Sequence, residues 1–224
     1  MDHINIAIDG PAGAGKSTVA REVAKRLGIL YLDTGAMYRA MALKAIRAGI
    51  EPADRAKVLT LLANTDISAK NNDGAQITYL DGEDVSTQIR TQQVSKGASD
   101  IAVIQEVREK LSQLQKRIAT QSDVVMDGRD IGSCIMPDSK FKFFITASVE
   151  ERARRRLLEL QAKGGYIDAN IESVCAEIEA RDHTDSTREF APLIYANDAV
   201  LIDTTDMDIQ STIEAIMGYL QETR

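Results

Sequence analysis

A run of residues near the start of the chain has the residue types of a phosphate-binding loop. It follows the pattern Gly, four residues, Gly-Lys-Ser/Thr, and consists of Gly10, Pro11, Ala12, Gly13, Ala14, Gly15, Lys16, Ser17 and Thr18. Glycines allow backbone angles that other residues avoid, so successive N–H groups can turn toward one phosphate. Lys16 can reach the β- and γ-phosphates as a mobile charge, and the Ser17 hydroxyl can ligate Mg²⁺, partly through water. We therefore expect this loop to bind a nucleoside triphosphate.

The sequence on both sides of the loop fits this interpretation. Residues 4–8 predict a strand that enters the loop, and residues 18–27 predict a helix that leaves it. The positive end of that helix dipole would point at the bound phosphates. An ordinary Gly-rich turn between a strand and a helix is the alternative, and the full match in this setting disfavours it.

Arginine is the second informative residue type. Four arginines, Arg39, Arg129, Arg181 and Arg188, lie where predicted strands or helices give way to the next segment. Phosphoryl transfer needs positive charge around the transferred group, and the planar guanidinium pairs well with phosphate oxygens. A solvated surface arginine is the alternative for each one taken alone. Together with the loop, these arginines predict a phosphoryl-transfer site.

A basic cluster later in the chain predicts a lid. Residues 151–156 hold four arginines and one glutamate in a chain that is acidic overall. A Gly-Gly pair at residues 164–165 follows as a flexible joint, as a segment that closes over ATP would need. A solvated basic helix face is the alternative. Spacing leaves open which of Arg152, Arg155 and Arg156 would contact ATP.

The acidic and histidine residues favour one class of reaction. Residues 123–127 predict a second core strand that ends in Asp127, a carboxylate that can act on Mg²⁺ directly or through water. His3 is close to the terminus and His183 lies in a predicted loop, so no nucleophile–His–acid set is evident. An acceptor that is itself a phosphate is already anionic and needs no general base. These observations favour a kinase acting on a phosphate acceptor over a hydrolase.

Length and composition limit the class of protein. The chain has 224 residues, 44% of them hydrophobic and 27% charged, which suits one α/β unit with mobile subdomains. A formal net charge of −7 argues against a nucleic acid polymer or a membrane surface as a partner. Cys134 and Cys175 are far apart and predict neither a disulfide nor a zinc site. With no leader segment evident, we expect a cytoplasmic monomer.

Alternating strands and helices predict a parallel sheet with crossover helices. Further strands are expected at residues 29–32, 140–146 and 199–202. Further helices are expected at residues 34–49, 51–64, 94–102, 107–120, 151–163, 171–181 and 208–220, with a loop at 181–188. Residues 66–69 and 75–80 instead predict two antiparallel strands around a turn at residues 71–74. This hairpin indicates an inserted lobe.

These motifs, taken in order, resemble those of bacterial cytidylate kinases, which belong to the nucleoside monophosphate kinases. The resemblance covers nearly the whole chain. Besides the phosphate loop, it rests on residues 33–39 (Asp-Thr-Gly-Ala-Met-Tyr-Arg), 82–85, 89–91, 107–108, 127–132 (Asp-Gly-Arg-Asp-Ile-Gly), Arg181, Asp182, Asp185, Arg188, Pro192 and Leu193. The Asp-Gly-Arg-Asp segment and the hairpin-bearing insertion are more specific to that family than the phosphate loop.

The resemblance implies a fold, a domain division and a reaction. The fold would be an α/β P-loop fold of three layers with a central parallel sheet, an inserted NMP-binding lobe and a short helical lid. In this single kinase chain the core would comprise residues 1–35, 100–150 and 190–224, the lobe 36–99 and the lid 151–185. The reaction would transfer the γ-phosphoryl group of ATP to CMP or dCMP in pyrimidine metabolism, with Mg²⁺.

Residue roles also follow from the resemblance. The CMP phosphate would be held by Thr34, Arg39 and Arg129, the cytosine by Ser99, Arg108 and Asp130, and the sugar by Arg181 and Asp185. Arg188 would help to gather the phosphates, Arg155 would bind ATP, and the catalytic residues would be Lys16, Arg129 and Arg188. A carboxylate such as Asp130 can accept from the exocyclic amine of cytosine, where uracil offers only an acceptor. Thr184 departs from members with arginine there, which puts one phosphate contact in doubt.

Three other functions compete with this interpretation. A kinase for UMP or shikimate would prefer an acceptor without an exocyclic amine. A regulatory GTPase would need an Asn-Lys-x-Asp guanine reader, and the sequence at residues 64–66 does not match one. A catalytically inactive nucleotide-binding module is disfavoured, because Lys16, Ser17 and the arginines are all present.

Overall fold

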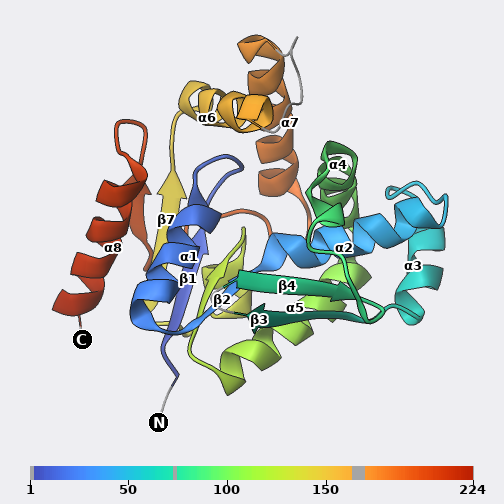
Figure 1. Ribbon diagram of the computed structural model, residues 1–224, viewed down its shortest axis with the longest axis horizontal. Coiled ribbons are helices and arrows are strands. Elements are labelled where there is room, and N and C mark those ends of the chain that lie inside the picture. The colour runs from blue at the N-terminus through green and yellow to red at the C-terminus, as the bar shows by residue number, and fades with distance from the viewer. Residues whose placement is uncertain (1–2, 73–74, 163–169, 224) are drawn as a thin grey trace.

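The computed structural model describes residues 3–72, 75–162 and 170–223, and Figure 1 shows its arrangement. The strands are β1 (Asn5–Asp9), β2 (Leu30–Asp33), β3 (Ile67–Asn72), β4 (Ala75–Leu80), β5 (Glu83–Asp84), β6 (Val124–Asp127), β7 (Phe141–Thr146) and β8 (Val200–Asp203). The α-helices are α1 (Lys16–Leu27), α2 (Thr34–Arg47), α3 (Arg55–Ala63), α4 (Gln92–Ile101), α5 (Gln105–Gln121), α6 (Val149–Ala162), α7 (Ile171–Thr187) and α8 (Ile209–Glu222). Two short turns are η1 (Gln88–Arg90) and the π-helical η2 (Ile131–Ile135).

A five-stranded parallel sheet forms the middle layer, in the order β2-β6-β1-β7-β8. Alternate residues of β1 face opposite sides. Ile6 and Ile8 pack with α1 and α8, and Ala7 packs with α5 and η2. Figure 1 shows these helices on the two sides of the sheet. Because both faces are covered, the central strands are almost wholly apolar, as is usual for parallel sheets. The predicted three-layer α/β P-loop fold is confirmed.

A second unit packs beside the sheet. Its antiparallel sheet has the order β3-β4-β5. A separate apolar core joins it to α2, α3, α4 and α5; its largest fully buried members are Met37, Met41, Ile89, Ile101 and Leu111. The predicted hairpin is therefore confirmed. Its turn is shorter than expected, because Asn71 and Asn72 belong to β3 and pair with Gln76 and Ala75; Asp73 and Gly74 lie outside the described residues. The boundaries of core, lobe and lid given above stay predictions.

Helices α6 and α7 project from the sheet at the end where the phosphate loop lies (Figure 1). A small apolar cluster of Ala153, Val174 and Ile178 holds the two helices together. The predicted Gly-Gly joint at residues 164–165 lies outside the described residues. None of the helices within residues 3–72, 75–162 and 170–223 combines the length and the apolar composition of a membrane-spanning segment.

Two helix boundaries expected from the sequence were wrong. The segment 181–188 was expected to be a loop, but helix α7 continues to Thr187. That segment contains no glycine or proline, and Asp182 and Asp185 bind partners from other elements, so tertiary contacts support the extra turns. The helix expected from residue 51 begins at Arg55, because the Asp54 side chain accepts from the Lys57 N–H and caps it.

Candidate active site

The phosphate loop joins β1 to α1 by a backbone that glycine alone adopts easily. Gly10, Gly13 and Gly15 have φ values of 143°, 78° and 85°. A Cβ at Gly10 would lie 1.9 Å from the Ile145 carbonyl oxygen, so no other residue fits there. Lys16 Nζ donates to the Pro11 carbonyl at 2.6 Å. Burial, and then the charge of Arg129, hold the pKa of Lys16 well below its usual value.

Ser17, the predicted metal ligand, lies against a strand-end carboxylate. Its hydroxyl donates to Asp127 Oδ2 at 2.7 Å, and the Tyr31 hydroxyl donates to Asp127 Oδ1 at 2.9 Å. Burial, and then the charge of Asp33, raise the pKa of Asp127 to about 6. A hydroxyl and a carboxylate beside a phosphate cradle are the oxygen ligands that suit Mg²⁺. Among the described residues no group of three or more His, Cys, Asp or Glu could hold a metal.

Asp9 is a buried carboxylate whose role sequence reasoning missed. It accepts from the Ile131 N–H at 2.9 Å and the Gly132 N–H at 2.7 Å. Burial raises its pKa to about 6. These bonds tie the last residue of β1 to the loop that carries Arg129 and Asp130. An acidic residue directly before the first loop glycine was the available signal.

The residues predicted to hold the acceptor phosphate meet at the ends of β2 and β6. Arg39 Nη2 pairs with Asp33 Oδ2 at 2.7 Å. The Thr34 hydroxyl donates to the Asp127 carbonyl at 2.8 Å, and Arg129 Nε pairs with Asp185 Oδ2 at 2.8 Å. The structure therefore brings Thr34 and Arg129 to the same strand end as Ser17.

Arg181 is a cation of the site with a buried, unsatisfied hydrogen-bond donor. Burial, and then the like charges of Arg129, Arg39 and Arg156, lower its pKa to about 10. Its Nε is buried with no hydrogen-bond partner among the described residues. A buried, unsatisfied guanidinium nitrogen costs free energy. An anion placed among these arginines would recover that free energy.

The predicted base-reading residues form a buried ion network. Arg108 Nη2 pairs with Asp130 Oδ2 at 2.6 Å. Arg188 lies 3.5 Å from Asp130 and 3.6 Å from Asp185. A pocket of about 360 Å³ opens beside Arg108 and Asp130. Ser99 is half-buried on α4, and the described residues show no hydrogen bond between it and this network.

The lid arginines have different environments. Arg152 is buried; it donates to the carbonyls of Ala147 at 2.9 Å and Ala12 at 3.0 Å, and pairs with Asp182 at 2.5 Å. Asp182 also accepts from the Ala12 N–H at 3.3 Å. Arg152 and Asp182 thus hold both polar groups of one phosphate-loop residue. Sequence reasoning did not foresee this clamp.

Arg155, the predicted ATP ligand, binds protein groups in this structure. Its Nε pairs with Glu151 at 2.8 Å, and its other nitrogens donate to the Thr204 hydroxyl at 3.0 Å and carbonyl at 2.6 Å. Arg156 pairs with Glu159 at 3.0 Å on the exposed side of α6. A contact between Arg155 and ATP stays a prediction.

The arrangement as a whole can bring two anionic groups together. Main-chain N–H groups and Lys16 form one half, and the arginines from α2, α7 and the loop after β6 form the other. Such preorganised positive charge is the main requirement of phosphoryl transfer.

Comparisons with known proteins agree with this geometry. A family model described as cytidylate kinase matches residues 6–222. The cytidylate kinase of Caldicellulosiruptor bescii is 50% identical over 217 residues, which cover 97% of this chain and 95% of that protein. The cytidylate kinase of Clostridioides difficile is 46% identical over 220 residues, covering 98% and 99%. A solved structure of an uncharacterized protein from Eubacterium ventriosum, 13% identical over 99% of both chains, has a similar fold with a TM-score of 0.56.

Proposed function

The chain belongs to the cytidylate kinase family, and on that premise we propose how its residues transfer the γ-phosphoryl group of ATP to CMP or dCMP. The products are ADP and CDP or dCDP. The bond between the γ-phosphorus and the β–γ bridging oxygen breaks, and a bond from the γ-phosphorus to a CMP phosphate oxygen forms. The attacking oxygen is already anionic, so the step needs no general base.

The phosphate loop holds the donor. Its N–H groups, over residues 10–18, cradle the β- and γ-phosphates, and Lys16 neutralises charge on them. Ser17 would hold Mg²⁺, with Asp127 acting through water; when bound, the metal neutralises charge on the phosphates. Arg155 is the lid residue that we assign to ATP.

The acceptor lies across from the loop. Thr34, Arg39 and Arg129 hold the CMP phosphate, and Arg181 and Asp185 hold the sugar. Arg188 lies next to both Asp130 and Asp185, the residues that we assign to the cytosine and the sugar. From there it would help to gather the phosphates of CMP and ATP. Of the arginines, Arg129 and Arg188 act with Lys16 on the transferred group. The unpartnered Nε of Arg181 is the observation that carries this proposal, because a buried guanidinium N–H without a partner lacks an acceptor oxygen that a bound nucleotide would supply.

The cytosine edge is read by Asp130, oriented by Arg108, with Ser99 as a further contact. Asp130 pairs with Arg108 and lies 3.5 Å from Arg188, and its carboxylate accepts from the cytosine amine. Uracil would present its carbonyl oxygen to this carboxylate and be repelled.

An ADP-release assay across CMP, dCMP, UMP, AMP, GMP and shikimate tests the proposal. We expect the highest kcat/KM with CMP or dCMP. The Asp130→Ala variant should lose more activity on CMP than on UMP. Equal losses on both acceptors would remove Asp130 from base reading, and a preference for shikimate would refute the proposed acceptor. The monomeric state and the cytoplasmic location stay predictions from the sequence.

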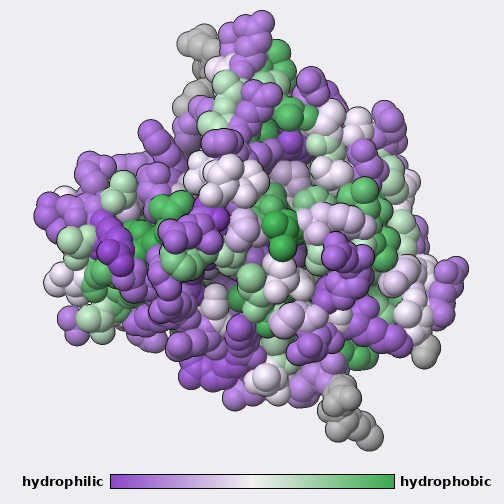
Figure 2. Space-filling model, turned by 180° about the vertical axis from the view of Figure 1, so that it is seen from behind, coloured by the Kyte–Doolittle hydropathy of each residue, from purple (hydrophilic) through white to green (hydrophobic). Residues whose placement is uncertain are grey.

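The formal net charge of −7 is the basis for the prediction that the chain does not bind a nucleic acid polymer. Figure 2 shows one face of the molecule, on which hydrophilic and hydrophobic residues are interspersed.

A further inference from the structure

Gln76 of β4 joins the inserted hairpin to the open edge of the main sheet. Strand β2 is the last strand on its side of that sheet. The Leu30 N–H donates to the Asp123 carbonyl at 3.1 Å, toward β6. Because main-chain groups alternate in direction along a strand, those of Asp33 point to the open edge.

The side-chain amide of Gln76 satisfies both main-chain groups of Asp33. Its Oε1 accepts from the Asp33 N–H at 2.6 Å, and its Nε2 donates to the Asp33 carbonyl at 3.3 Å. One side chain thus replaces a neighbouring strand at this residue. Nε2 also donates to the Thr78 hydroxyl at 3.1 Å, which fixes which way the amide faces.

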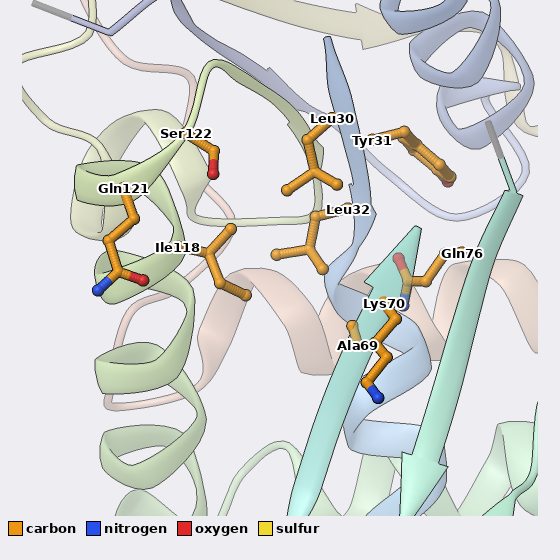
Figure 3. A pocket seen from close by; sticks show the side chains of 9 residues that line it. All are labelled: Leu30, Tyr31, Leu32, Ala69, Lys70, Gln76, Ile118, Gln121 and Ser122. Atoms are coloured by element: carbon orange, nitrogen blue, oxygen red, sulfur yellow. The ribbon is translucent and has the colours of Figure 1, made fainter. Parts of the chain in front are cut away.

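A pocket of about 210 Å³ beside this link shows that the hairpin is not tightly packed on the sheet here. Figure 3 shows Leu30 and Leu32 facing Ile118 of α5 on one side of β2. On the other side, Gln76 reaches from β4 toward β2 (Figure 3). The amide therefore supplies a directional connection where apolar packing is incomplete.

Asp33 connects the backbone held by Gln76 to Arg39, a predicted ligand of the CMP phosphate. Its carboxylate accepts from the Ala36 N–H at 3.0 Å, which caps α2, and pairs with Arg39 at 2.7 Å. Burial opposes ionisation of Asp33, yet the nearby charge of Arg39 keeps its pKa below the usual value. The Asp33 side chain thus orients Arg39, while Gln76, which lies outside the main sheet, binds the Asp33 backbone.

We infer that Gln76 is a positioning residue for the acceptor: by binding the Asp33 backbone it sets Arg39 and the hairpin relative to the phosphate loop. This inference rests on the proposed function, because it takes Arg39 as a contact of the CMP phosphate. Gln76 itself does not touch the reacting groups. Its effect should appear in acceptor binding and leave donor binding unchanged.

The first test uses Gln76→Met, which keeps the length of the side chain and removes both hydrogen bonds to Asp33. Gln121→Met is the matched control, since Gln121 lines the same pocket from α5. Loss of two net hydrogen bonds predicts a KM for CMP about 10-fold higher, with the KM for ATP within about 2-fold of wild type. Gln121→Met should leave both values unchanged. Equal changes in both KM values, or none, in Gln76→Met would overturn the inference.

The second test does not depend on turnover. Amide hydrogen exchange should show the Asp33 N–H protected in the wild type and exchanging faster in Gln76→Met. Thr78→Val removes only the hydroxyl that accepts from Gln76 Nε2. It should cause a smaller increase in the exchange rate of the Asp33 N–H, and it can replace Gln76→Met if that variant does not fold. An unprotected Asp33 N–H in the wild type would refute the link.

The two proposals fail in different ways. A wild-type enzyme that does not phosphorylate CMP would refute the proposed function, whatever the exchange data show. An enzyme active on CMP, with a Gln76→Met variant of unchanged KM for CMP, would refute the positioning role alone.

Discussion

Removing the carboxylate of Asp182 should loosen the phosphate loop from the lid helices. In Asp182→Ala, the Ala12 N–H loses its acceptor and Arg152 loses its ion-pair partner. Breaking a buried ion pair typically costs about 3–5 kcal/mol. The Arg152 side chain is 6% exposed and that of Asp182 is 22% exposed, and Arg152 keeps two carbonyl acceptors. We therefore expect a lower cost of about 2–3 kcal/mol.

Two measurements check this expectation. The melting temperature should fall by about 5–10 °C, since 1 kcal/mol corresponds to roughly 2–4 °C in a chain of this size. The KM for ATP should rise more than the KM for CMP, because Arg152 and Asp182 hydrogen-bond the donor-loop residue Ala12, whereas Asp182 affects Arg129 only through its charge. Glu214→Ala is the control: it removes a partner of Arg26 in an exposed pair and should cost less than about 1 kcal/mol.

A double-mutant cycle measures the coupling energy between Arg152 and Asp182. Arg152→Met combined with Asp182→Ala should show a coupling energy of about 1–3 kcal/mol, since the two side chains are in direct contact. Additive single-variant effects would mean that the pair does not act as a unit. A stability loss that leaves the KM for ATP unchanged would refute the claim that the clamp shapes the donor site.

Three further changes test the site. Lys16→Ala should lower turnover by orders of magnitude with the fold intact, as judged by circular dichroism; retained turnover would remove the loop from catalysis. Gly10→Ala should abolish folding or ATP binding, because its Cβ would overlap the Ile145 carbonyl; normal ATP binding by calorimetry would contradict this. The raised pKa of Asp9, about 6, means that the folded state binds more protons than the unfolded state between pH 4 and 6. This contribution to the free energy of unfolding therefore falls by up to about 3 kcal/mol as the pH rises through that range. Denaturant titrations of Asp9→Asn should show a smaller fall than the wild type, because Asp127, whose pKa is also raised to about 6, keeps its own contribution.

Local patterns predicted most of the fold. The phosphate loop and the hairpin formed by β3 and β4 each depend on residues close together in the sequence. Gly28 follows the last residue of α1 and ends the helix with a φ of 66°. Such signals depend on residues only a few positions apart, so they can be recognised in the sequence without knowing the tertiary structure.

The links between elements could not be predicted in the same way. Gln76 and Asp33 are 43 residues apart, and Asp182 and Ala12 are 170 apart. A glutamine in a strand or an aspartate in a predicted loop has many partners that the sequence does not rank. The helical extension of α7 was missed for this reason, since the contact of Asp182 with the phosphate loop contributes to it.

The topology of the sheet explains why the site is rich in arginine although the chain is acidic. Strands β2, β6 and β1 are neighbours, and each ends in a carboxylate: Asp33, Asp127 and Asp9. Asp33 and Asp127 are direct partners in the strand register, and their mutual repulsion contributes to the raised pKa of Asp127. Ligands of open α/β sheets bind at this carboxyl edge, where phosphates would add further negative charge. The compensating cations must then come from outside the sheet, and helix α7, which carries Arg181, projects toward the same edge as the phosphate loop.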